Sequence, residues 1–135
     1  MLLVDSSVWI DVGRAIATDA TRFLDARDDH DEIATTGIIV HEVLQGVKSD
    51  VLYEDLLTRF WAMLILEPRQ IATYEVAAQL YRRARLMGLT IRKPNDCLIA
   101  AIALEHGALL VHNDRDFLSL AQVEPSLMVF PGRPH

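Results

Sequence analysis

The stretch Leu2-Leu3-Val4-Asp5-Ser6-Ser7 decides how this chain folds, because it joins a short apolar run directly to an acidic residue and a turn. An apolar run that stops at a carboxylate is typical of a buried strand that delivers a charge to the end of a sheet. Three further apolar runs border carboxylates in the same way: 38–41 before Glu42, 97–104 after Asp96, and 109–113 before Asp114 and Asp116.

The apolar periodicity and the turn-forming residues along the rest of the chain predict strands that alternate with helices. We expect strands at 1–4, 33–36, 63–66, 109–111 and 127–130. Helices are predicted at 18–27, 38–45, 50–61, 70–87 and 94–106, with short helical stretches through Trp9 and at 117–120. The helix that begins at Pro94 is apolar nearly all round, so we expect it to be buried, with Asp96 in its first turn. The alternation indicates an α/β fold with a central parallel sheet covered on both faces.

Length and composition favour one domain over residues 1–135. The chain has 51% hydrophobic and 24% charged residues, which is enough to close a packed core. Its single cysteine, Cys97, cannot form an intramolecular disulfide, and we expect it to be a buried thiol. No apolar run is long enough to span a bilayer and no signal core is evident, so we expect a cytoplasmic protein without membrane association.

Charge argues against a protein that coats nucleic acid. The 13 Lys and Arg residues are outnumbered by 19 Asp and Glu, giving a net charge of -6. This balance leaves open an enzyme that receives phosphate through a bound metal ion. Local basic clusters at 82–85 and at Arg92-Lys93 either guide a polyanion or are simply solvated.

The four acidic segments together predict a metal site. Each Asp alone is explained as well by helix capping or turn formation. Carboxylates from four distant segments at one sheet end would repel one another unless cations neutralise them. Hard oxygen ligands in that number suit Mg²⁺ or Mn²⁺.

Other chemistries fit the spacing less well. Ser6 and Ser7 lie in no nucleophile elbow and no phosphate-binding loop, so a hydroxyl there is expected to hydrogen-bond Asp5 or a metal-bound water. The histidines have no partnering cysteines, and His41 and His112 either touch substrate or pack structurally. Trp9, Trp61 and the tyrosines are expected to lie in the core, because no aromatic pair is interleaved with basic residues.

Four motifs in this order resemble the PIN-domain ribonucleases, most closely the VapC toxins of prokaryotic toxin–antitoxin pairs. The motifs are 5–11 (DSSVWID), 40–46 (VHEVLQG), 94–100 (PNDCLIA) and 111–117 (VHNDRDF). The resemblance covers essentially the whole chain. It implies an α/β/α sandwich and Mg²⁺-dependent cleavage of RNA, with Mn²⁺ as a substitute.

Carried over position by position, the resemblance assigns a catalytic quartet and a metal-ligand set. The residues that match the acidic quartet are Asp5, Glu42, Asp96 and Asp114. The residues that match the metal ligands are Asp5, Asp96, Asp114 and Asp116. Ser6 matches the small polar accessory residue. The family often has Thr where this chain has His112 or Asn113, which leaves the choice between Asp114 and Asp116 as last ligand open.

The resemblance also implies partners. We expect an RNA substrate, a small VapB-like antitoxin whose arginine enters the acidic pocket, and a homodimer formed through the apolar faces of helices 50–61 and 70–87. On the latter helix the expected apolar face is Tyr74, Ala77, Ala78, Tyr81 and Ala84. Two alternatives stay open. One is a non-toxin PIN-like module that binds or processes RNA. The other is a different acid-metal enzyme such as a phosphatase, which would usually need a second acid at position 7, where this chain has Ser7.

Overall fold

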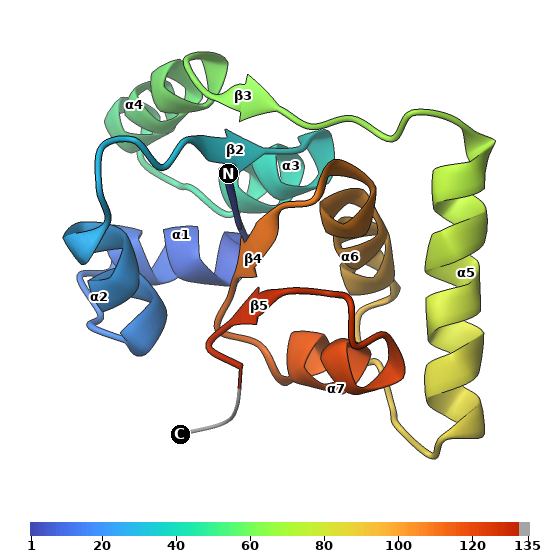
Figure 1. Cartoon of the computed structure of the whole chain (residues 1–135). Helices are drawn as coiled ribbons and strands as arrows, with labels where there is room; N and C mark the ends of the chain where they lie inside the picture. The colour runs from blue at the N-terminus through green and yellow to red at the C-terminus, as the bar shows by residue number, and fades with distance from the viewer. Residues whose placement is uncertain (133–135) are drawn as a thin grey trace.

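The computed structural model describes residues 1–132, so the last three residues of the predicted 1–135 domain lie outside the described part of the chain. Within it, five strands alternate with seven helices (Figure 1). The strands are β1 (Leu2–Val4), β2 (Ile33–Thr35), β3 (Leu64–Ile65), β4 (Leu109–Val111) and β5 (Val129–Phe130). The helices are α1 (Ser6–Gly13), α2 (Asp19–Ala26), α3 (Gly37–Gln45), α4 (Asp50–Trp61), α5 (Ile71–Leu86), α6 (Pro94–His106) and α7 (Arg115–Val123).

The strands form one parallel sheet in the order β3-β2-β1-β4-β5. The first and fourth strands are therefore neighbours, with Val4 paired to Val111. The chain leaves β1 toward β2 on one side and returns at β4 on the other, which makes the β1/β4 boundary the switch point of the sheet. Parallel α/β sheets bind their ligands at the carboxyl ends of strands at this point.

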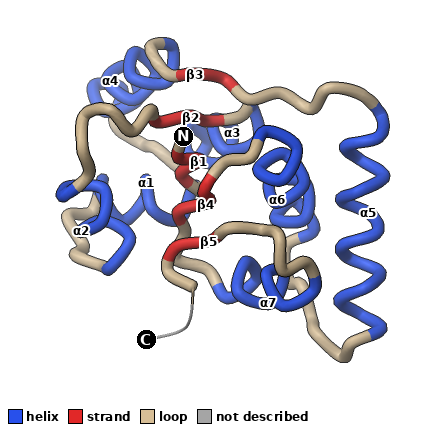
Figure 2. Tube along the Cα trace, viewed as in Figure 1, coloured by secondary structure: helices blue, strands red, loops and turns tan. Residues whose placement is uncertain are grey.

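Helices cover both faces of the sheet. In Figures 1 and 2, α5, α6 and α7 lie together on one side of the strands, and α1 and α2 lie on the opposite side. Helix α5 packs on α6 and α7, whereas α1 contacts α2 and α3, and α3 contacts α4. The predicted α/β/α sandwich with a central parallel sheet is confirmed.

The core lies between the central strands and α6. Leu3, Val4, Leu110 and Val111 have no exposed surface, because both faces of their strands are covered. Seven residues of α6 are buried, which agrees with the apolar sequence of that helix. Fully burying a Leu, Ile or Val side chain contributes about 1.5–3 kcal/mol, so α6 is a major source of stability.

Three local expectations were wrong. The buried residues of α5 are Thr73, Ala77, Leu80 and Ala84, so its packed face is rotated relative to the one expected, and Tyr74 is 53% exposed. The short helical turn expected at 117–120 is the longer helix α7, because the Asp114 side chain accepts a hydrogen bond from the Asp116 N–H and caps it. Trp61 was expected in the core but is 82% exposed.

No helix in the described residues combines the length and apolar character needed to cross a membrane.

Candidate active site

Asp5 lies at the carboxyl end of β1 and is almost fully buried. Its Oδ2 accepts hydrogen bonds from the Ser7 backbone N–H at 3.1 Å and from the Ser7 hydroxyl at 2.6 Å, so this oxygen caps α1. Burial raises the pKa of Asp5, the hydrogen bonds from Ser7 oppose that rise, and the charge of Asp114 adds to it. The other oxygen, Oδ1, is buried and has no hydrogen-bond partner.

Asp114 and Asp116 follow β4, directly beside Asp5. The Asp5 backbone N–H donates to the Val111 carbonyl at 2.9 Å, which fixes the end of β1 against the end of β4. Asp114 Oδ1 accepts from the Asp116 N–H at 3.0 Å and caps α7. The two oxygens of Asp116 accept from the backbone N–H groups of Arg92, at 3.2 Å, and Lys93, at 3.0 Å. The segment before α6 thereby holds Asp116 in one orientation.

Asp96 completes a cluster of three carboxylates. One oxygen each from Asp96, Asp114 and Asp116 lies within 4.8 Å of the others. Asp96 is 2% exposed, and burial together with the charge of Asp5 and a hydrogen bond to Asp116 raises its pKa to about 9. A buried carboxyl surrounded by other acids retains its proton unless a cation neutralises the group.

Glu42, on α3, lies near Asp5 and Lys93, whose charges act on it. Its Oε2 accepts a hydrogen bond from the Ser6 hydroxyl at 3.3 Å, and its Oε1 is buried without a partner. Burial and the charge of Asp5 raise the pKa of Glu42. Ser6 therefore connects α1 to the acidic residue on α3.

Lys93 places a cation directly against Asp114. Its Nζ lies 2.7 Å from Asp114 Oδ2, and the Lys93 side chain is 58% exposed while that of Asp114 is 8% exposed. Burial opposes ionisation of Asp114, but the hydrogen bond from Lys93 and the charges of Lys93 and Arg92 hold the pKa of this carboxyl below its usual value. The contact with Asp114 correspondingly raises the pKa of Lys93, so both groups are ionised at neutral pH.

Three carboxylate oxygens in this site are buried and unpartnered: Asp5 Oδ1, Glu42 Oε1 and Asp96 Oδ2. Leaving a buried charged acceptor without a partner costs more than about 1–3 kcal/mol, so this group of oxygens is suited to bind a cation. The donor set therefore fits Mg²⁺ or Mn²⁺, which are held by a few carboxylates and leave positions for phosphate.

A groove of about 410 Å³ opens beside the acids. Its lining residues are Ser6, Ser7, Ile10, Asp11, Glu42, Gln45, Lys93 and Asn113. Asn113 is fixed in this wall because its backbone N–H donates to the Ser7 hydroxyl at 3.0 Å and its side-chain amide donates to Asp11 at 2.9 Å. Of the five acids of the site, Glu42 lines this groove directly, and Lys93 connects the groove to Asp114.

The structure clusters three of the six predicted site residues, Asp96, Asp114 and Asp116. The charge of Asp114 acts on Asp5, and Ser6 donates a hydrogen bond to Glu42, on which the charge of Asp5 acts. The expectation that a serine hydroxyl bonds Asp5 is confirmed by Ser7. Two further groups at the site were not singled out from the sequence: the Lys93 ammonium and Asn113. The Arg92-Lys93 pair was noticed only as a charge cluster, and nothing in the sequence links it to Asp114.

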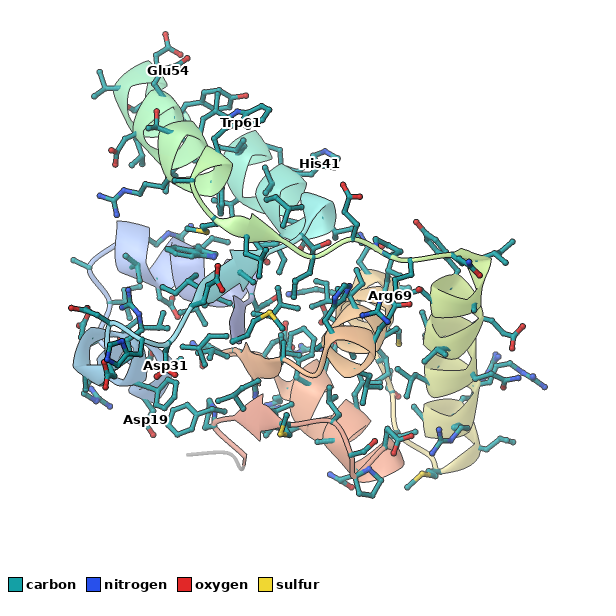
Figure 3. The ribbon with its side chains drawn as sticks, turned by 45° about the horizontal axis from the view of Figure 1, so that its top comes forward. Asp19, Asp31, His41, Glu54, Trp61 and Arg69 are labelled. Carbon is teal, nitrogen blue, oxygen red and sulfur yellow. The ribbon has the colours of Figure 1, made fainter. Side chains whose placement is uncertain are left out.

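The two histidines beside the acids differ in role. His112 is buried, and because its Nδ1 accepts from the Asp114 N–H at 3.1 Å, its Nε2 carries the proton and donates to the Pro131 carbonyl at 2.9 Å. Burial lowers its pKa, so it is a neutral structural residue. His41 instead lies on the exposed side of α3, beside Trp61 at the end of α4 (Figure 3).

Comparisons with known proteins agree with the fold. The family model described as PIN domain matches residues 2–123. Ribonuclease VapC11 of Mycobacterium tuberculosis and a VapC ribonuclease of Mycobacterium bovis are each 35% identical over 127 residues, covering 91% of this chain and 93% of the relative. The solved structure of VapBC2 from Rickettsia felis, bound to a DNA fragment from its promoter, superposes with a TM-score of 0.71 at 20% identity, covering 95% of this chain and 96% of that chain.

Proposed function

This chain belongs to the PIN-domain family, within its VapC ribonuclease branch, and on that premise we propose that it is a metal-dependent endoribonuclease and the toxin of a toxin–antitoxin pair. The observation that carries the proposal is the cluster of Asp96, Asp114 and Asp116 beside the switch point of the sheet, with Asp5 close enough to raise the pKa of Asp96 and with three buried acidic oxygens of the site unpartnered. The whole chain is proposed to act as one PIN domain.

Asp5, Asp96, Asp114 and Asp116 are the proposed ligands of Mg²⁺, for which Mn²⁺ can substitute. When bound, such an ion lowers the pKa of an attacking water and stabilises the negative charge that develops on the scissile phosphate. The ligand oxygens that face one another belong to Asp96, Asp114 and Asp116, and Asp5 contributes its free Oδ1 from the neighbouring strand.

The residues around the ligands hold them in position. Ser7 clamps one oxygen of Asp5, and the backbone N–H groups of Arg92 and Lys93 fix Asp116. Glu42 is held by the Ser6 hydroxyl with its other oxygen free, so we assign it the role of accepting a proton from the attacking water. The proposed substrate is RNA, with the reacting phosphate at the acids and an adjoining nucleotide in the groove that Gln45 and Asn113 line.

The proposed protein partner is a VapB-like antitoxin that binds an apolar groove between α3 and α4. This groove has a volume of about 350 Å³ and is lined by Gly37, Val40, His41, Leu57, Phe60, Trp61 and Ile65. Trp61 and His41 flank it in Figure 3. An amphipathic helix inserts its apolar side chains into grooves of this kind. An arginine that follows such a helix can bind the acidic cluster bidentately and displace the metal.

We further propose a cytoplasmic homodimer. Helix α5 leaves Ile71 86% and Leu86 85% exposed, and Tyr74 lies half exposed between them. Exposed apolar side chains of this size along one helix favour a protein interface. Light scattering at micromolar concentration is expected to give twice the mass of the chain, and a monomer would contradict this part of the proposal.

The nuclease proposal is tested with purified protein, total RNA and Mn²⁺. The wild-type chain should cleave RNA, EDTA should stop cleavage, and Asp96→Asn should be inactive. Asp29→Asn is the matched control. It makes the same substitution at an exposed position in the loop before β2, which is not one of the acids of the site. Cleavage by Asp96→Asn at the wild-type rate would contradict the assignment of Asp96 to the active site.

The toxin proposal is tested in cells. Expression of the chain alone should arrest growth and degrade RNA, and coexpression with its neighbouring gene should restore both. Normal growth in both cultures, with a purified protein that is an active nuclease, contradicts control by an antitoxin and favours an RNA-processing module.

A further inference from the structure

Lys93 links the acidic cluster to the groove. Its backbone N–H donates to Asp116, and its Nζ lies 2.7 Å from Asp114 Oδ2. The same side chain lines the groove together with Ser7, Gln45 and Asn113. The main chain of Lys93 is therefore fixed at the acids, while more than half of its side chain is open to solvent on the groove side.

The charge around the groove makes this position unusual. Among the described residues that line the groove, Lys93 is the only cation, and Asp11 and Glu42 are both acidic. The chain as a whole carries a net charge of -6, so a polyanion meets repulsion over most of the surface. An RNA phosphate in this groove requires a local positive charge in addition to a metal ion at the acids.

The ammonium of Lys93 and a divalent cation compete for the same carboxylate. The ammonium already lies against Asp114, whose side chain is mostly buried, and it also interacts with the charges of Asp96 and Asp5. Two cations against one carboxylate repel each other. Lysine is suited to move away, because its ammonium is a point charge on a flexible four-carbon stem.

We propose that Lys93 is a phosphate-binding residue for the RNA substrate, which the metal-free protein holds on Asp114 as a counter-ion and which metal entry releases into the groove. This inference rests on the proposed nuclease function and adds a residue outside the acidic set. It gives Lys93 two measurable effects of opposite sign, since its charge weakens metal binding and strengthens RNA binding.

The chain contains two lysines, which provides a matched pair of variants. Lys93→Met removes the ammonium and keeps the length of the stem. Lys48→Met makes the same change at an exposed position between α3 and α4, outside the groove lining. Lys93→Arg retains the charge and should keep KM within about threefold of the wild type.

Two measurements test the proposal. Calorimetric titration with Mn²⁺ in the absence of RNA should show Lys93→Met binding at least about threefold more tightly than the wild type. On a defined single-stranded RNA, Lys93→Met should raise KM about tenfold or more with a smaller effect on kcat, and should reduce the slope of log KM against log salt concentration by about 0.7. Lys48→Met should change neither quantity.

The proposal is overturned if Lys93→Met leaves either the Mn²⁺ affinity or the KM within the range of Lys48→Met. Loss of Mn²⁺ binding in Asp96→Asn in that same experiment leaves the nuclease function standing, so the two failures are distinguishable. A folded wild-type protein that neither binds Mn²⁺ nor cleaves RNA overturns both.

Discussion

Replacing Asp96 by Asn should stabilise the metal-free protein at neutral pH while it abolishes cleavage. The pKa of Asp96 is about 9 in the folded protein and 3.8 in its ordinary state, because the carboxyl is buried among other acids. Between these two values the folded chain holds a proton that the unfolded chain has released. The free energy of unfolding therefore falls as the pH rises through this window.

The magnitude follows from the width of the window. Each pH unit is worth about 1.36 kcal/mol for one proton, so the interval from 3.8 to pH 7 corresponds to an upper bound of about 4 kcal/mol. Relaxation around the site reduces this, and we expect a gain on the order of 2 kcal/mol for Asp96→Asn at pH 7. Only well below pH 3.8 is the wild-type carboxyl protonated in both states, so the difference in stability should be smaller at pH 4.5 than at pH 7 and should vanish below about pH 3.

Urea unfolding in EDTA at pH 4.5, 7 and 8.5 measures this difference, with the fluorescence of buried Trp9 as the probe. Asp29→Asn serves as the control and should follow the wild type at each pH. Parallel stability profiles for Asp96→Asn and the wild type would refute the reasoning. Addition of Mn²⁺ should then stabilise the wild type and leave Asp96→Asn unchanged, because only the protein that binds the ion gains from it.

Three other substitutions test separate parts of the molecule. Ser7→Ala removes the hydroxyl that holds Asp5 and should weaken Mn²⁺ binding about tenfold or more, with Ser7→Thr retaining most of it; an unchanged Mn²⁺ affinity contradicts a positioning role. Trp61→Ala should alter the free energy of unfolding by less than about 0.5 kcal/mol, because Trp61 is 82% exposed, yet weaken antitoxin binding at least about tenfold by calorimetry. Gly107→Ala should destabilise the protein by about 1–2 kcal/mol in urea, because Gly107 ends α6 with a φ of 64° that other residues adopt at a cost.

The sequence predicted most elements because their ends carry strong local signals. Pro94 and Gly107 bound α6, and both ends are where the sequence placed them. The prediction of the buried face of α5 was wrong, because Ala, Tyr and Leu recur along this helix at two overlapping helical spacings. Thr73 is buried there because its hydroxyl donates to Glu105 on α6 at 2.7 Å, a contact that the sequence of α5 alone does not reveal.

The acids of the site could be predicted because each borders an apolar run, and a buried strand or helix formed by such a run fixes the position of the acid at its end. Their supporting residues could not be predicted in the same way. The hydroxyl of Ser7 meets the backbone of Asn113 across a separation of 106 positions, and Lys93 meets Asp114 across 21. Such contacts depend on the order of strands in the sheet, which local patterns do not specify.

Helix capping and metal binding are not competing explanations for Asp5 and Asp114. A carboxylate has two oxygens, and in Asp5 the oxygen that faces Ser7 caps α1 while the other is buried and unpartnered. In Asp114 one oxygen caps α7 and the other holds Lys93. Each cap restricts the rotation of its side chain, so the second oxygen is oriented toward the site before any ligand arrives. The helices that begin at these residues thus supply the rigidity that a cluster of mutually repelling carboxylates needs.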